Sequence, residues 1–432
     1  MRLDIVNGSI VTGDGVSLLE NTAIIIEEGL ITDLPKVSYV PYNAYADKYI
    51  NANGGLIIPG IINIHSHGIA FGPFFPYGWR RPSPERILFN LDTHLLQGTT
   101  TLINGDGFAL PFEVEAANKA HPVNIKPCTA HFPASFRAAE IAGAEVLDEW
   151  HKKFTAEEYA ELGAVAIGEI GSPGTTAGTS EKSARLGKVI SVNHAKALDK
   201  AVINGDEAEI RKVLTEMELP SMSIAEAKKL VEETSILPVE ACCDAIRESA
   251  IYVKKLGIPV IAHAEPGMRE ALLDAAKEIG PMLIATHVNH SFTVEEMVSF
   301  AKELKALGAT VEVITADFFG AKQVESSPEG AFALLREGLV DEVSTDYSGG
   351  YHEPILLFLQ KAIEEKLVTL PQAIKLATSA SAGIVPRAAA HRGLIAPGKV
   401  ADLCIVDKDD ISKVRYVIIA GKVVVEEGKI VG

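Results

Sequence analysis

The stretch GLIIPGIINIHSHG, residues 55–68, is the most informative part of the chain for the fold, because a β-branched apolar run ends there in His65-Ser66-His67. Residues two apart in an extended chain share one face, so both imidazoles could reach one metal ion. The pair alone is weak evidence, because a chain with 12 histidines produces such a triplet by chance in about one case in three. Its meaning depends on the residues that close the other strands.

Outward from this stretch, short apolar segments alternate with amphipathic helices such as 293–307 and 355–366. This alternation is typical of βα units around a parallel sheet. Eight such units predict an α/β fold of the closed (β/α)8 TIM barrel type over residues 58–392. An open doubly wound sheet is the alternative, but it would not need a metal-type residue closing so many strands. The strands are expected at 60–65, 99–104, 123–130, 163–169, 257–263, 282–287, 310–315 and 341–346.

The two ends of the chain differ from this middle. Residues 1–57 and 393–432 contain β-branched runs punctuated by Gly and Asn, which predict one small β-sandwich domain assembled from both ends. Within the barrel, a helical insertion is expected at about 172–238, after the fourth strand. It lies on the side where the active-site loops of a barrel lie. A lid, a subunit contact and a solvated elaboration without either role all remain open.

Metal-type residues also end four later strands of the predicted barrel. Because the carboxyl ends of parallel barrel strands surround one opening, these side chains should converge. Each follows an apolar run, where a charged or polar side chain is costly unless it is paired or bound to metal. The set contains no thiolate, which disfavours a structural zinc site of the finger type. The predicted metal ligands are His65, His67, Glu169, His263, His287 and Asp346.

Such a set could hold two divalent ions, with His65, His67 and Asp346 on one, and His263 and His287 on the other. Glu169 would then bridge them, although binding to a single ion stays open. Two ions sharing a water would lower the pKa of that water and polarise a substrate carbonyl. Asp346 could act as ligand and general base together, passing the proton to the leaving nitrogen. Zinc suits these ligands, as do iron, manganese and cobalt.

At this point the chain resembles the amidohydrolase superfamily, over nearly its whole length. Residues 55–68 are similar to the family's first-strand signature, GLIAPGKVADLCIVD (393–407) to its return into the β domain, and VIIAGKVVVEEGKIV (417–431) to its closing hairpin. The resemblance implies the same metal-ligand roles for His65, His67, His263, His287 and Asp346.

Glu169 departs from the commonest pattern of that family, in which a carboxylated lysine bridges the metals. Its surroundings, VAIGEIG (165–171), are similar to enamidase, a cyclic enamide hydrolase, as are HAEPG (263–267), THVNHS (286–291) and STDYSGG (344–350). The long insertion is not expected of enamidase.

Several residues beside the expected metal site could bind substrate or orient a ligand. The loop 68–86 is rich in aromatic residues, Pro and Gly, and an arginine in it could pair with a substrate carboxylate. Ordinary loop hydrogen bonding is the competing interpretation for each residue, and packing between loops is the competing one for the aromatic side chains. The candidates are Asn104, His131, His290, Tyr347 and Arg80.

These features predict metal-dependent hydrolysis of a non-peptide C–N bond, most simply in a cyclic amide such as a lactam, imide or enamide. A deaminase of a heterocyclic amine is one alternative, although Glu265 falls one residue earlier than the acid that such enzymes place after the fifth-strand histidine. A hydrolase of N-acyl amino acids or dipeptides is another, since metal chemistry does not define the acyl partner. A metal-dependent phosphodiesterase or DNase, and a catalytically inactive scaffold protein, complete the alternatives.

The net charge and the distribution of apolar residues limit the kinds of binding partner that we expect. The net charge of −17 would repel phosphate backbones, so nucleic acid is not expected as a partner. No apolar run approaches the roughly 20 residues that cross a bilayer, and the N-terminal MRLDIVNGSIV lacks the apolar core of a signal peptide. We therefore expect a cytoplasmic protein with a small-molecule substrate and no membrane partner, which assembles as a homo-oligomer.

Overall fold

The computed structural model describes residues 1–36, 46–74, 81–144, 146–171, 175–315, 328–347 and 353–431. All eight predicted barrel strands are present, and each pairs in parallel with the next along the chain. They are β8 (Ile61–Ser66), β9 (Thr99–Asn104), β10 (Asn124–Thr129), β11 (Ala166–Ile170), β12 (Val260–His263), β13 (Leu283–Thr286), β14 (Thr310–Ile314) and β15 (Glu342–Ser344).

The last strand returns to the first just beyond the end of β15. The Asp346 N–H donates to the His65 carbonyl over 3.0 Å, and the His67 N–H donates to the Tyr347 carbonyl over 2.7 Å. A parallel bridge also joins Ser66 to Tyr347. These contacts close the sheet, which confirms the predicted TIM barrel and places Asp346 beside the two histidines of the first strand.

Helices surround the barrel and bury one face each. In α12 (Val294–Ala306) the Thr293 hydroxyl accepts from the Glu296 N–H, and the Glu296 carboxylate accepts from the Thr293 N–H. This capping box fixes the start of the helix, and the apolar face that follows packs on the barrel. The other barrel helices are α1 (Pro84–Leu96), α2 (Pro111–Ala120), α3 (Pro133–Ile141), α4 (Glu149–Lys153), α5 (Ala156–Glu161), α10 (Leu237–Leu256), α11 (Arg269–Ile279), α13 (Pro328–Arg336), α14 (Ile355–Glu364), α15 (Leu370–Leu376) and α16 (Ser379–Ile384).

Both ends of the chain build a second body of two sheets. β7 pairs antiparallel with β16, so a strand from the N-terminal part lies beside one from the C-terminal part. Their buried faces share a core that includes Ile57, Leu403 and Ile418. This confirms the β-sandwich prediction, while the domain boundaries at 57 and 393 stay predictions. One sheet holds β1 (Arg2–Val6), β4 (Ile24–Glu27), β5 (Leu30–Asp33) and β6 (Lys48–Asn51); the other holds β2 (Ser9–Val11), β3 (Leu18–Leu19), β7 (Leu56–Pro59), β16 (Leu403–Val406), β17 (Val414–Ile419), β18 (Lys422–Glu426) and β19 (Lys429–Ile430).

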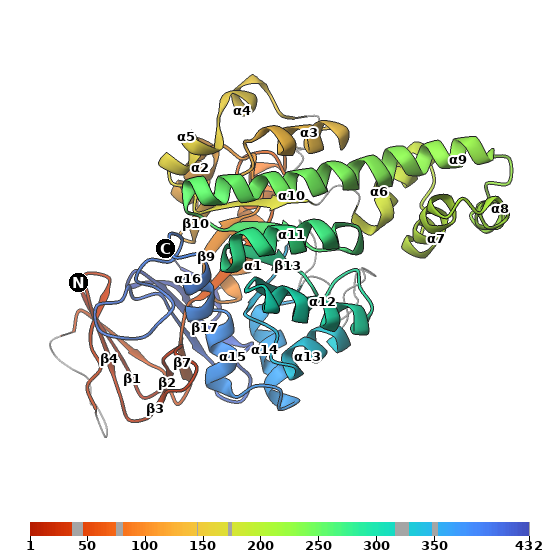
Figure 1. Cartoon of the computed structure of the whole chain (residues 1–432). Helices are drawn as coiled ribbons and strands as arrows, with labels where there is room; N and C mark the ends of the chain where they lie inside the picture. Colours follow the sequence, from red (N-terminus) through yellow and green to blue (C-terminus); the bar gives the residue numbers. More distant parts are fainter. Residues whose placement is uncertain are drawn as a thin grey trace.

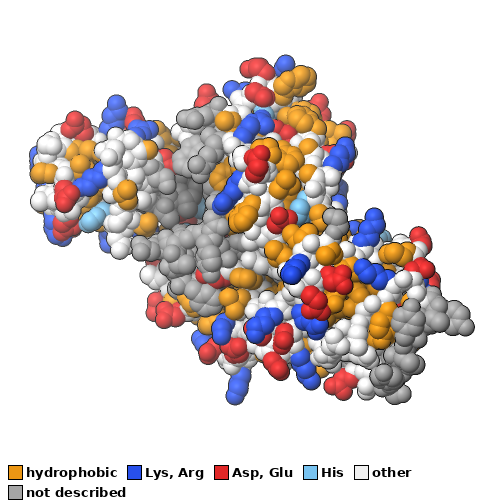
Figure 2. Space-filling view, turned by 180° about the vertical axis from the view of Figure 1, so that it is seen from behind, with side chains coloured by type: hydrophobic (Ala, Val, Ile, Leu, Met, Phe, Trp, Pro, Cys, Tyr) orange, Lys and Arg blue, Asp and Glu red, His pale blue; other side chains and the backbone are white. Residues whose placement is uncertain are grey.

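The expected insertion is helical and projects from the barrel at one end of α10 (Figures 1 and 2). We call residues 175–236 the arm. Leu198, Leu214 and Val231 belong to a small apolar core of the arm's own. The arm consists of α6 (Thr175–Leu186), α7 (Val192–Ile203), α8 (Glu207–Glu216), α9 (Ile224–Val231) and a π-helical turn, η1 (Glu232–Ile236), that leads into α10. Among the helices of the described ranges, none combines the length and apolarity needed to cross a membrane.

Candidate metal centre

The six predicted ligands come together as two groups of three at the carboxyl end of the barrel. In the first group, the Nε2 atoms of His65 and His67 are 3.2 Å apart. Asp346 Oδ1 lies 3.5 Å from Nε2 of His65 and 3.4 Å from Nε2 of His67. A tetrahedral zinc ion with ligand bonds of 2.0–2.1 Å requires donor atoms about 3.3 Å apart. The three atoms therefore have the separation that such an ion needs.

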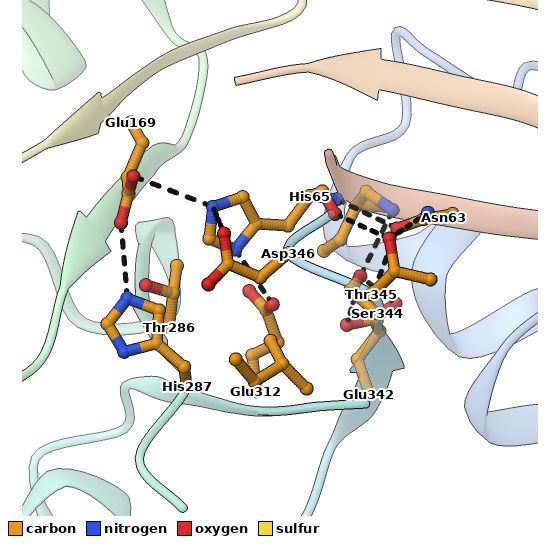
Figure 3. A network of polar contacts seen from close by, with 12 residues as sticks. Asn63, His65, Glu169, Thr286, His287, Glu312, Glu342, Ser344, Thr345 and Asp346 are labelled. Atoms are coloured by element: carbon orange, nitrogen blue, oxygen red, sulfur yellow. Dashed lines mark hydrogen bonds and ion pairs between the residues drawn. The ribbon is translucent and has the colours of Figure 1, made fainter. Parts of the chain in front are cut away.

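The second group is built around Glu169, whose two oxygens face different neighbours (Figure 3). Oε1 lies 2.9 Å from His263 Nδ1 and 3.1 Å from His287 Nε2. Oε2 lies 3.3 Å from His67 Nε2 and 3.7 Å from His65 Nε2. The carboxylate thus stands between the two groups and turns one oxygen towards each.

Two buried acids hold the first-strand histidines from behind. Glu312 Oε1 lies 3.0 Å from His65 Nδ1, and Asp106 Oδ1 lies 2.9 Å from His67 Nδ1. The other Asp106 oxygen accepts the Gly68 N–H over 2.7 Å. A carboxylate that accepts a hydrogen bond from Nδ1–H keeps the proton on that nitrogen, leaves Nε2 free to bind metal and fixes the ring orientation.

The sequence interpretation missed both of these acids. Glu312 did carry a signal, since it is the charged residue within the apolar strand TVEVIT (310–315) and is fully buried. Asp106 follows the end of the second strand by two residues and is also buried, but nothing in the sequence distinguishes it from a loop aspartate.

The electrostatics of the cluster suit cations. Burial acts to lower the pKa of His65, but Glu312, Asp346 and Glu169 outweigh it and raise that pKa well above its usual value. Burial raises the pKa of the Asp346 carboxyl, whereas His65 and His67 lower it to about 2. The pKa of Glu169 is likewise held low, against burial, by His263, His287 and His65. In the described ranges no lysine or arginine pairs with Glu169 or Asp346. Acids and imidazoles concentrated in this way fit two divalent ions.

The residues predicted to bind substrate differ in how close they lie to the metal ligands. His290 lies beside the second group, with its ring centroid 5.8 Å from that of His287, and its Nδ1 is 2.5 Å from Ser291 Oγ. Burial lowers the pKa of His290 to about 3, so its imidazole is neutral at pH 7. Tyr347 donates its hydroxyl to Asn90 Oδ1 over 2.7 Å.

Asn104 and His131 are both buried. The Asn104 amide donates to the Asp106 carbonyl over 3.4 Å, and its Oδ1 has no partner among the described residues. The imidazole of His131 is enclosed by the rings of Phe108, Phe136, Phe154 and Tyr159 rather than by the metal ligands. Arg80 lies outside the described residues.

No protein-family model and no curated protein sequence matches this chain, but solved structures do. One match is the beta-aspartyl dipeptidase of Fervidobacterium islandicum AW-1, solved with a beta-Asp-Leu dipeptide. The match covers 100% of this chain and 98% of the dipeptidase chain, with a TM-score of 0.62 and 16% sequence identity. A second match is enamidase, described as a member of the amidohydrolase superfamily. It covers 99% of this chain and 97% of the enamidase chain, with a TM-score of 0.53 and 17% sequence identity. This chain has the amidohydrolase fold. A D-hydantoinase shares that fold over 100% of this chain and 97% of its own, with a TM-score of 0.55 and 16% identity.

At these identities the likeness concerns the amidohydrolase fold and not the substrate. Within that fold, the polar cluster lies where the carboxyl ends of the barrel strands meet, which is where barrel enzymes place their active sites.

Proposed function

We propose that this protein is a metal-dependent hydrolase of non-peptide C–N bonds and that its substrate is a cyclic amide. The observation that carries the proposal is the position of Glu169, with one oxygen towards His263 and His287 and the other towards His65 and His67. A carboxylate placed in this way is suited to bridge two divalent ions, for which zinc is the first choice and iron, manganese and cobalt are alternatives. When bound, such ions lower the pKa of a water and polarise a carbonyl.

Asp346 is the proposed general base. Its side chain is 23% exposed, whereas those of His65 and His67 are fully buried, so it reaches both the ligands and the opening. With a pKa of about 2 it is ionised at neutral pH. It accepts a proton from the attacking water as the new C–O bond forms, and it delivers that proton to nitrogen as the C–N bond breaks.

The choice of a cyclic amide rests on the local likeness of the Glu169, His263 and His287 segments to enamidase, and on the presence of enamidase and hydantoinases among the structures that share the fold. A second candidate has its own support: the beta-aspartyl dipeptidase structure, at a TM-score of 0.62, overlays better than the D-hydantoinase and enamidase at 0.55 and 0.53. Hydrolysis of a dipeptide or N-acyl amino acid is therefore the alternative.

Metal analysis combined with a substrate panel tests this function. The purified protein should hold two equivalents of metal and open at least one ring among hydantoin, dihydrouracil, succinimide and small lactams. Glu169→Gln should lose at least one equivalent and lower kcat/KM by roughly a thousandfold, since the variant removes the charge that both groups share. Glu270→Gln, at an exposed glutamate on α11, is the matched control and should retain both metal and activity.

Two results would count against these assignments. Retention of both metal ions by Glu169→Gln would contradict the bridge. Turnover of beta-aspartyl or N-acyl substrates without turnover of any ring would replace the cyclic amide with the second candidate.

A further inference from the structure

A large groove separates the arm from the barrel. It encloses about 1170 Å³ and is bounded by α7, by the π-helical turn with the start of α10, and by the loops that follow β12 and β13. The sequence predicts the arm and leaves its role open. The apolar side chains that line the groove are Val202, Ile203, Ile236, Val239, Pro266 and Phe292.

The groove begins next to the metal ligands. Glu265 lines it and follows His263 by two residues, with its Oε2 3.9 Å from His263 Nε2. Ser291 also lines it and contacts His290, whose ring stacks edge-on against His287. The groove therefore runs past the carboxyl ends of β12 and β13, beside the segments that carry His263 and His287.

Charges of both signs nearly balance along the groove. Lys196 and Lys200 line it from α7, and Glu240, Glu265 and Glu296 line it from the barrel side. A groove of this composition offers apolar contact without a strong preference for a charged ligand.

A fourth acid of the groove, Asp199, is already neutralised inside the protein. The Lys182 ammonium is fully buried, lies 2.8 Å from Asp199 Oδ1 and donates to Ser235 Oγ over 2.6 Å. This cluster joins α6, α7 and the π-helical turn, and turns of this type occur frequently at functional sites. It fixes the arm side of the groove before any ligand binds, which reduces the entropic cost of binding.

We infer that the groove binds a bulky apolar substituent of the substrate, such as a benzyl or isobutyl group, while the amide bond lies at the metal centre. The inference rests on the proposed function and names the substrate class for it. Ligand sites usually enclose most of the ligand surface. An unsubstituted hydantoin or succinimide ring at the metal centre would leave the groove empty, whereas a bulky substituent would make use of its apolar lining.

Matched substrates test the inference. We expect kcat/KM for 5-benzylhydantoin to exceed that for 5-methylhydantoin at least tenfold, and 2-phenylsuccinimide to exceed succinimide similarly, because each buried methylene is worth several-fold in specificity. Val239→Asp should reduce the benzyl-to-methyl ratio at least fivefold. Ile203→Asp, at a side chain that is 68% exposed and so tolerant of change, repeats the test should Val239→Asp fail to fold. Ile251→Asp, at an exposed position of α10 outside the groove, is the control and should leave the ratio unchanged.

The outcomes separate this inference from the proposed function. Equal turnover of the methyl and benzyl compounds, or a ratio that neither groove variant changes, overturns the groove assignment and leaves the hydrolase assignment intact. If no ring is opened, the proposed function fails, and binding measured by calorimetry tests the groove assignment instead. Tighter binding of 5-benzylhydantoin than of 5-methylhydantoin, with the difference lost in Val239→Asp, supports the groove assignment. Equal binding of the two compounds overturns it.

Discussion

Replacing Glu312 with glutamine should weaken metal binding without removing any metal ligand. Glu312 is fully buried, its Oε1 lies 3.0 Å from His65 Nδ1, and its Oε2 has no partner among the described residues. The carboxylate holds the proton of His65 on Nδ1 and so leaves Nε2 free as a ligand. A glutamine can turn its NH2 group towards Nδ1 instead, which favours the tautomer with the proton on Nε2 and removes that nitrogen from the donor set.

The expected magnitude follows from this contact. Loss of a partner behind a metal-bound imidazole typically costs 10–100-fold in metal affinity, or about 1.4–2.7 kcal/mol. The assay is competition with a chromophoric chelator for zinc at pH 7, which gives the dissociation constants of the wild type and the variant.

Glu342 provides a matched control one strand away. It is the register partner of Glu312 on β15 and is equally buried, but it accepts hydrogen bonds from Ser344 and Ser381. In the described part of the chain, no hydrogen bond or ion pair joins it to His65. Burial, together with the charge of Glu312, raises the pKa of Glu342 well above its usual value. Because Glu342 bonds serine hydroxyls and not a metal-ligating imidazole, Glu342→Gln should change the zinc affinity less than threefold. Equal zinc affinities for Glu312→Gln and the wild type, or equal losses in the two variants, would refute the reasoning.

Three further predictions follow from the packing and the pKa shifts. Gly60→Ala would place a methyl group against the Thr100 side chain and should lower the free energy of unfolding by roughly 1–3 kcal/mol in urea, whereas Gly383→Ala, with open space around it, should not. Burial lowers the pKa of His131 to about 3, so as the pH falls the imidazole of the unfolded chain is protonated before that of the folded protein. The free energy of unfolding should therefore decline from about pH 6.5 towards pH 3, by up to roughly 4 kcal/mol. His131→Phe should flatten that part of the denaturation profile, and an unchanged slope would contradict the assignment of a neutral buried ring. Removal of metal with a chelator should lower the Tm, because an ion at 1,000 times its Kd stabilises the folded state by about 4 kcal/mol; an identical Tm with and without chelator would argue against a metal bound in the core.

The barrel and the set of candidate ligands could be predicted from local sequence patterns. A short apolar run precedes or includes each of four ligands, His65, Glu169, His263 and His287. This pattern is local, so it can be recognised without knowing which strands are neighbours. The closed barrel then brings these strand ends together, because all parallel strands present their carboxyl ends on one side.

The partners of those ligands could not be predicted in this way, because they depend on how distant strands and loops pack. Glu312 and Asp106 meet His65 and His67 because of strand register and loop course, neither of which the sequence displays. His131 ends a strand in the same way as the ligands do, yet aromatic side chains from four other positions enclose it. The groove beside the arm likewise depends on how α7 packs against the π-helical turn and the loops after β12 and β13. Local sequence fixes where a polar residue stands on its own strand, whereas its neighbours come from residues far apart in the chain, and folding alone brings them into contact.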